Sequence, residues 1–316
     1  MSSIKMPFHH EDMVILINQA FGKKEPTNDE EMKAAAKSQF GIIKSEYEEI
    51  SQAIDLHDTD KLRDALADFK VTLFGYPYLV AGVRITDRIV MSMQDRFFVD
   101  QNTSLTEVAS IAIMNSRLHS EAKPGTRRTL IQDIETDEQW AALQETIDRS
   151  LASEMTGLER NTRKGKYEDA INNVINLVMT AYRIESSFGI PTDSDFEEVC
   201  SKLLTRLCSS EEVAAATIKK YADEKGIETH YEESPSIPGM FAVRSSKDQT
   251  SLDGEHFPAN KFLKSIEFAE PVFKELPVKT NFTQAEPEVQ EPDDLQAKLF
   301  EDYTPEYPGH EEETRG

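Results

Sequence analysis

The chain has 316 residues, enough for two domains or one large one, and enough apolar residues to build a core. It carries 35 lysines and arginines against 58 aspartates and glutamates, and this net charge of -23 argues against duplex nucleic acid or an anionic membrane as the main partner. There is no signal-peptide pattern and no uncharged apolar run of about 18 residues, and Cys200 and Cys208 lack metal-site spacing. We therefore expect a soluble, cytoplasmic protein.

The first predicted elements are two antiparallel helices between residues 40 and 76. Apolar residues recur at helical spacing on both sides of the short connection LHDTD: Phe40, Ile43, Tyr47, Ile50 and Ile54 before it, and Leu62, Leu66, Phe69, Leu73 and Tyr76 after it. Such a short connection makes the two helices neighbours in space.

Four carboxylates border these apolar stripes. Glu46 and Glu49 lie one turn apart on the first helix, and Asp64 and Asp68 lie in an otherwise apolar run of the second. Packing the two stripes together brings the four acids close, where they repel one another unless a cation binds them. Hard oxygen ligands suit Mg²⁺ or Mn²⁺, so the pattern predicts a divalent metal and, through it, a phosphate. The alternative for Glu46 and Glu49 is a solvated helix flank.

A second helical unit shows the same pattern without the acids. Aligning RDALADFKVTLFG (63–75) with INNVINLVMTAYR (171–183) matches the apolar positions and sets Asp64 and Asp68 against Asn172 and Asn176. LTEVASIAIMNSRLHS (105–120) resembles FEEVCSKLLTRLCSS (196–210) in the same way. We interpret the two units as repeats, of which the second has lost its metal. Chance similarity between two apolar helices is the alternative.

Two basic segments interrupt the acidic chain, TRRTLI (126–131) and RNTRKGK (160–166). Solvated loops are the default interpretation of both, and contact with phosphate is the alternative.

The C-terminal part changes character twice. SSEEVAAATIKKYADEKG (209–226) has the caps and charge order of a helix, and GIETHYEE, GMFAVRSS and KFLKSIEF resemble short strands, which predicts a small α+β appendage. Residues 274–316 hold five prolines and 12 acidic against 4 basic residues. That composition predicts a disordered acidic tail, which could recruit a protein partner.

The order E-x-x-E, short connection, then an acidic helix ending in V-x-x-x-G resembles that of the all-α nucleotide pyrophosphohydrolases related to MazG. FHHEDMVILINQAFG (8–22) is similar to the opening helix of the phage-encoded branch of this family, and FGIPTDSDFEEV (188–199), together with the predicted helix and strands up to residue 273, resembles its C-terminal extension. The resemblance implies Mg²⁺- or Mn²⁺-dependent hydrolysis of a nucleoside triphosphate to monophosphate and pyrophosphate, in the host cytoplasm if the protein is phage-encoded. It also implies assembly, here between the two halves or as a homo-oligomer.

The resemblance carries over residue by residue. Glu46, Glu49 and Asp64 match the catalytic metal ligands, and Asp68 is added from the residue pattern. Lys61 stands where the family has an acid, so it either contacts phosphate or leaves a ligand to be replaced by Asp60 or Asp68. Asn115 and Arg117 are the nearest match to the nucleotide-binding residues, and Leu203 takes the asparagine's place in the second half.

The expected fold class is thus an all-α helical bundle of two MazG-like repeats with a small α+β appendage and a disordered acidic tail. The expected boundaries are 1–125 for the catalytic repeat, 126–208 for the degenerate repeat, 209–273 for the appendage and 274–316 for the tail. The alternative function is a binding module for a nucleotide or a protein on the same scaffold, without turnover.

Overall fold

The computed structural model describes residues 9–86, 88–89 and 130–276, and these residues are mostly helical. They form seven α-helices and one 3-10 turn: α1 (His10–Ala20), α2 (Asp29–Asp55), α3 (Thr59–Ala81), the turn η1 (Ile131–Asp133), α6 (Asp137–Arg163), α7 (Tyr167–Phe188), α8 (Thr192–Leu204) and α9 (Glu211–Lys225). The prediction of a mainly helical chain is confirmed. None of the helices in these described stretches is both long and apolar enough to cross a membrane.

The helices α2 and α3 form the predicted hairpin. The side chain of Asn28 accepts a hydrogen bond from the backbone N–H of Glu31 and caps α2, and Asp58 caps α3 by accepting from Lys61. Between the helices His57 has a φ of 54°, a left-handed conformation that reverses the chain in three residues. Gly82, with a φ of 63°, ends α3 in the same conformation.

The helices α6 and α7 form a second hairpin with the same construction. The side chains of Thr136 and Gln139 form a capping box at the start of α6. Gly165, with a φ of 68°, occupies the place of His57 in another three-residue connection. The spans 29–55 of α2 and 137–163 of α6 differ by 108 at both ends, as do the starts of α3 and α7 at residues 59 and 167.

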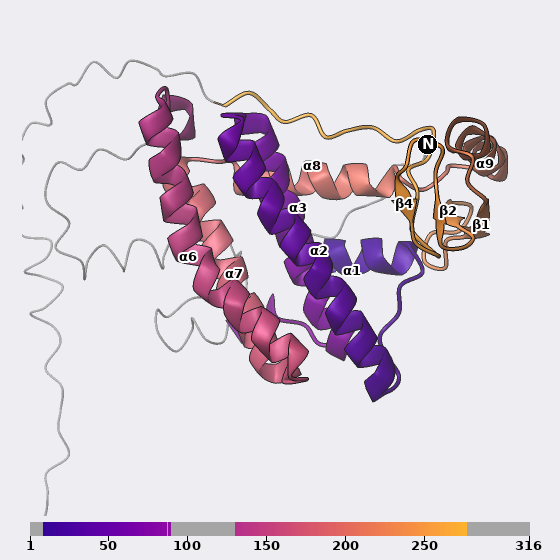
Figure 1. Cartoon of the computed structure of the whole chain (residues 1–316), viewed down its shortest axis with the longest axis horizontal. Helices are drawn as coiled ribbons and strands as arrows, with labels where there is room; N and C mark the ends of the chain where they lie inside the picture. The colour runs from indigo at the N-terminus through magenta and orange to yellow at the C-terminus, as the bar shows by residue number, and fades with distance from the viewer. Residues whose placement is uncertain (1–8, 87, 90–129, 277–316) are drawn as a thin grey trace, which may run out of the picture. The chain divides into compact units, whose positions relative to one another are not determined.

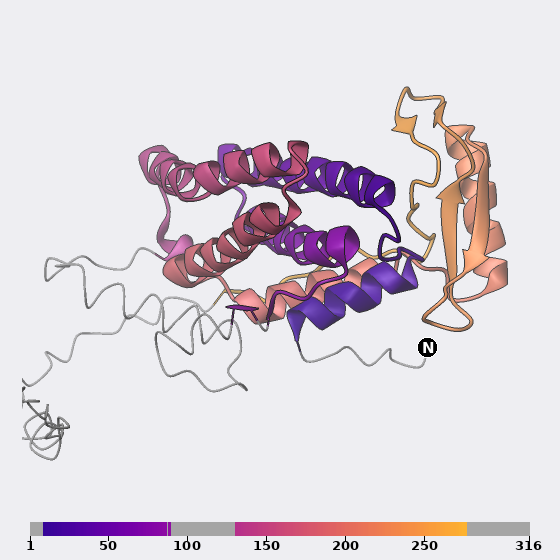
Figure 2. The same ribbon diagram turned by 90° about the horizontal axis from the view of Figure 1, so that it is seen from below.

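The two hairpins pack side by side, with α2 against α6 and α3 against α7 (Figure 1). The helices α1 and α8 contact each other and cover another side of α3, so that α3 lies between the hairpin layer and this pair (Figure 2). The burial of α3 follows from this position. Its side chains in the main core include Leu62, Leu66, Phe69, Leu73, Phe74 and Tyr76, each at most 1% exposed.

A fully buried ion pair joins α3 to α7. Lys70 Nζ lies 2.7 Å from Glu185 Oε1 and 2.8 Å from Oε2, and the two side chains are 0% and 1% exposed. The ammonium group also lies 4.8 Å from the ring centre of Tyr182 and 5.3 Å from that of Phe196. The second hairpin therefore supplies the counter-ion of a cation of the first, and Tyr182 of α7 and Phe196 of α8 supply its aromatic cover.

The appendage consists of α9 and two small antiparallel sheets. The strands β1 (Thr229–Glu233) and β2 (Phe241–Ser245) pair over five residues, as predicted, and β3 (Gln249–Thr250) pairs with β4 (His256–Phe257). Cys208, Ala214, Ile227, Val243, Phe257 and Leu263 form a core of their own beneath them. Both cysteines of the chain, Cys200 and Cys208, are buried free thiols.

The predicted strand KFLKSIEF (261–268) is wrong. This segment meets β2 only at the isolated bridge between Arg244 and Phe262. Its backbone bonds change partner within a few residues, because Leu263 N–H donates to Val243 whereas Ser265 N–H donates to Arg206. The segment therefore leaves the sheet after a single bridge and crosses towards the end of α8.

The predicted tail begins inside the described residues, because residues 274–276 are placed and have no regular structure. Leu276 packs against the main core, and the compact unit ends there. Residues 277–316, and most of the segment 90–129 between the two hairpins, lie outside the described part of the chain.

Candidate functional site

The four predicted metal ligands lie on the first hairpin, Glu46 and Glu49 on α2 and Asp64 and Asp68 on α3. Glu46, Asp64 and Asp68 are partly covered by protein, and Glu49 is exposed. Their charges act on one another: Asp68, Glu49 and Asp64 all repel an ionised Glu46. We call these four residues the carboxylate cluster.

The carboxylate cluster is short of positive charge. Burial, followed by repulsion from Asp68 and Glu49, raises the pKa of Glu46 to about 8. Burial, followed by repulsion from Asp64, raises the pKa of Asp68 to about 7. Burial, followed by repulsion from Glu270 and Glu49, raises the pKa of Asp64 to about 6. Partly desolvated acids in such numbers hold protons near neutral pH unless a cation joins them.

The segment that was wrongly predicted as a strand lies beside this cluster. Lys264 attracts Asp64 and lowers its pKa, whereas Glu270 raises it. Lys264 Nζ is 2.9 Å from Glu270 Oε1 and 4.2 Å from the ring centre of Phe268. The appendage therefore contributes both a cation and a fifth carboxylate to the surroundings of the cluster.

Arg206, just after α8, is a functional candidate that the sequence patterns did not single out. Its charge lowers the pKa of Glu46, Asp64 and Asp68, the three half-buried acids. The guanidinium carbon lies 5.5 Å from the ring centre of Phe268, and the buried Nε has no hydrogen-bond partner among the described residues. A buried donor without a partner beside an acid cluster is a position where a ligand oxygen can bind.

A signal for Arg206 was present in the sequence. It is the only charged residue in LLTRLCSS, whose Leu204, Leu207 and Cys208 are buried. A cation in an apolar run raises the same question of a partner as Asp64 and Asp68 do.

The structure separates Lys61 from its possible substitutes. Lys61 is exposed in the first turn of α3, with its Nζ 3.7 Å from Asp58 Oδ2. Asp60 is exposed and its Oδ1 lies 3.3 Å from Arg63 Nη1, so it is engaged elsewhere. Of the two acids considered as replacements for the missing ligand, Asp68 is the one that belongs to the carboxylate cluster. Asn115 and Arg117 lie outside the described residues.

The corresponding corner of the second hairpin, 108 positions later, has a different composition. Glu154 replaces Glu46, Gly157 replaces Glu49, and Asn172 and Asn176 replace the two aspartates. Both asparagines are exposed, and Glu154 Oε2 accepts a hydrogen bond of 2.7 Å from Asn173. One carboxylate is left here where the first hairpin has four.

The donor set of the carboxylate cluster fits Mg²⁺ or Mn²⁺, because it consists of hard oxygens whose raised pKa values a dication would lower again. In the described part of the chain, no three His, Cys, Asp or Glu side chains already meet in a metal-binding arrangement. The acids would have to rotate towards a common ion, which Glu49 can do freely because it is exposed.

Comparison with known proteins gives no relative: no family model, no curated protein and no solved structure matches the chain. The resemblance to the MazG-related enzymes therefore stays a prediction from the residue pattern.

Proposed function

We propose that this chain is a Mg²⁺- or Mn²⁺-dependent nucleoside triphosphate pyrophosphohydrolase with its active site at the carboxylate cluster. The observation that carries the proposal is the accumulation of partly buried, mutually repelling acids on one hairpin, next to a buried guanidinium with an unused donor. Acids and such a cation at one place suit a ligand made of a metal and a phosphate chain.

The acids would hold the metal. Asp64 and Asp68 come from the buried helix α3 and have limited freedom, so they would fix its position, and Glu46 and Glu49 would close on it from α2. When bound, the dication supplies positive charge to the phosphate oxygens and lowers the pKa of an attacking water.

Cationic side chains of the appendage would hold the phosphates. Arg206 would donate its free Nε–H to a phosphate oxygen, and Lys264 would exchange Glu270 for the same ligand. In the reaction, the water oxygen bonds to the α-phosphorus, the bond from that phosphorus to the bridging oxygen breaks, and pyrophosphate leaves. Glu46, whose pKa is raised to about 8, is suited to accept the proton of the water.

The finer fold assignment, two fused MazG-like repeats, is part of the proposal. The constant difference of 108 residues between the hairpins and their matching left-handed connections support it. In this account the second hairpin is a built-in partner that covers α3 and supplies Glu185 to Lys70, which leaves one catalytic cluster per chain. Host-cytoplasmic location and a nucleoside triphosphate substrate are proposed on the same resemblance.

A second candidate function is a binding module without turnover. Two observations favour it: Lys61 stands where the family has an acid, and no metal-binding group is preassembled among the described residues. Such a protein would bind the nucleotide at Arg206 and the cluster but would release no pyrophosphate.

One assay separates the two candidates. The purified chain is incubated with a panel of ribo- and deoxyribonucleoside triphosphates in Mg²⁺, in Mn²⁺ and in excess chelator, and products are separated by ion exchange. We expect equal amounts of monophosphate and pyrophosphate, and none with chelator. Saturable nucleotide binding without any product would establish the binding module, and release of inorganic phosphate alone would exclude attack at the α-phosphorus.

A further inference from the structure

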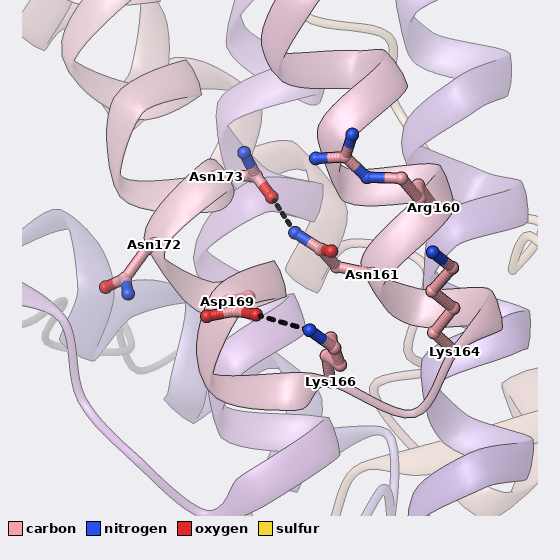
Figure 3. Close-up of a pocket in the computed structure, with 7 residues that line it drawn as sticks. All are labelled: Arg160, Asn161, Lys164, Lys166, Asp169, Asn172 and Asn173. Carbon is pink, nitrogen blue, oxygen red and sulfur yellow. Dashed lines mark hydrogen bonds and ion pairs between the residues drawn. The ribbon is translucent and has the colours of Figure 1, made fainter.

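The connection between α6 and α7 borders an open pocket of about 420 Å³ on the second hairpin. Arg160, Asn161 and Lys164 reach it from the end of α6 and the connection, and Lys166, Asp169, Asn172 and Asn173 line it from the start of α7. Figure 3 shows the side chains of Arg160, Lys164 and Lys166 around the amides of Asn161 and Asn173, with Asn172 on the opposite side of α7.

The rim of this pocket is positive in a chain with a net charge of -23. Its three cations face a single carboxylate, Asp169, whose Oδ2 is 3.8 Å from Lys166 Nζ. Neither Arg160 nor Lys164 forms an ion pair with any residue of the described part of the chain (Figure 3). Two cations are therefore held close together without a counter-ion, which costs free energy that an anion would recover.

The floor of the pocket consists of two ordered amides. Asn161 Nδ2 donates to Asn173 Oδ1 over 2.8 Å, and Asn173 Nδ2 donates to Glu154 Oε2 over 2.7 Å. Each amide nitrogen carries two hydrogens, so each keeps one donor for a ligand. Asn161 is only 8% exposed, and its hydrogen bond to Asn173 restricts its orientation.

Gly157 makes room for this floor. A Cβ atom at Gly157 would lie 2.6 Å from Asn173 Nδ2 and 3.1 Å from its Cγ, closer than packed atoms approach. The asparagine is too short to move aside without turning its amide. The glycine that removes a carboxylate from the second hairpin thus also admits the amide network.

The same corner of the first hairpin has the opposite character. Positions 108 lower than the pocket residues hold Gln52, Ala53, Leu56, Asp58, Lys61, Asp64 and Ala65. Two carboxylates and one cation stand there in place of three cations and one carboxylate. The preference of this corner is therefore reversed from cations to anions between the hairpins.

We propose that the pocket between α6 and α7 binds a small phosphate-bearing anion, held by Arg160 and Lys164 at the rim and by the amides of Asn161 and Asn173 at the floor. A guanidinium, an ammonium group and two amide donors match the several oxygens of one phosphate group better than the two of a carboxylate. Inorganic phosphate, pyrophosphate and a nucleoside monophosphate share this chemistry. The proposal is independent of turnover at the carboxylate cluster.

The test uses the full chain in excess chelator, so that no metal draws phosphate to the carboxylate cluster. Inorganic phosphate, pyrophosphate and adenosine monophosphate are titrated separately by calorimetry, and the side-chain amide signals of Asn161 and Asn173 are followed by NMR. We expect saturable binding with shifts of both amides, and the relative affinities identify the preferred source of the phosphate group.

Arg160→Gln with Lys164→Gln should weaken this binding about tenfold or more, since each removes a charge-assisted hydrogen bond. The matched control, Lys219→Gln with Lys220→Gln, removes two exposed lysines of α9 and should leave the affinity unchanged. Gly157→Ala keeps every charge and should also weaken binding, because it displaces Asn173. Equal affinity in the pocket and control variants, or no saturable binding of any of the three anions in the millimolar range, would overturn the proposal.

Discussion

Arg63 of α3 and Asp195 of α8 form a two-point ion pair in the protein interior. Arg63 Nε lies 2.7 Å from Asp195 Oδ2, Nη2 lies 2.7 Å from Oδ1, and both side chains are 2% exposed. The ring of Phe273 covers the guanidinium at 4.8 Å. Together with Lys70 and Glu185, this pair joins the acid-bearing helix to the second half of the chain through fully desolvated charges.

Asp195→Ala should lower the free energy of unfolding by about 3–5 kcal/mol, because it leaves the Arg63 cation buried without its partner. Urea denaturation followed by circular dichroism measures the change. Asp60→Ala is the control, since Asp60 also contacts Arg63 but is 77% exposed, and it should have little effect. Equal losses in the two variants would show that burial does not set the strength of this pair.

The carboxylate cluster should make the protein less stable as the pH rises. In unfolded chains these acids have pKa values near 4, whereas in the fold the pKa values of Asp64, Asp68 and Glu46 are raised to about 6, 7 and 8. Between those limits the folded state binds more protons, so the free energy of unfolding falls with rising pH until the folded pKa values are passed. Urea midpoints measured at steps across that range give the slope.

His10 acts in the opposite direction at lower pH. Burial lowers its pKa from 6.5 to about 3, so its contribution to stability is lost as the pH falls through that window. The test therefore compares wild type with Asp68→Asn, which removes one raised carboxylate and leaves His10 in place. We expect the variant to be the more stable at about pH 8 and Mn²⁺ to stabilise wild type more. A variant that is less stable than wild type at this pH would contradict the assigned repulsion.

Arg206→Gln should raise KM by about tenfold or more with a smaller effect on kcat, because it removes a charge-assisted hydrogen bond to the substrate phosphates. It should also raise the pKa values of the half-buried acids further, so the rising limb of the pH–rate profile should move to higher pH. Arg206→Lys should recover part of the affinity. A loss of stability with unchanged KM would reduce Arg206 to a structural role.

Restoring aspartates to the second hairpin should not create a second site. Asn172→Asp with Asn176→Asp returns two acids, but Gly157 still stands in place of Glu49, and the neighbouring connection carries Arg160 and Lys164. We expect the number of Mn²⁺ ions bound per chain, counted by electron paramagnetic resonance, to stay the same as in wild type. A second equivalent site would contradict the account of a single catalytic half.

The hairpin that carries the cluster could be predicted because its information is local. Helical spacing fixes the stripe of α3, and three-residue connections fix which helix lies beside it. The partners of Arg63 and Lys70 could not be predicted in this way. Asp195 and Glu185 are 132 and 115 residues away in sequence, and no periodic pattern links residues across such a distance. The apolar run drew attention to Asp64 and Asp68, although the two cations of the same helix are the more deeply buried charges.

The prediction for residues 261–268 failed for a related reason. Alternating apolar residues there are as expected of a strand, but the segment is covered from several sides, by β2 at Phe262 and by the end of α8 at Ser265. Alternation reports burial on one face and does not identify the neighbour. Arg206 was missed for the opposite reason, since a single cation has no period at all.

The most direct test of the central claim is pyrophosphate release by three versions of the full chain in Mn²⁺. Asp64→Asn removes one member of the carboxylate cluster, and Glu48→Gln removes an exposed acid of the same hairpin that pairs only weakly with Lys44, at 3.7 Å. We predict that Asp64→Asn lowers the rate by about a hundredfold or more while its circular dichroism stays that of wild type, and that Glu48→Gln keeps the wild-type rate. Pyrophosphate release by Asp64→Asn at the rate of the other two proteins would contradict the assignment of the carboxylate cluster as the active site.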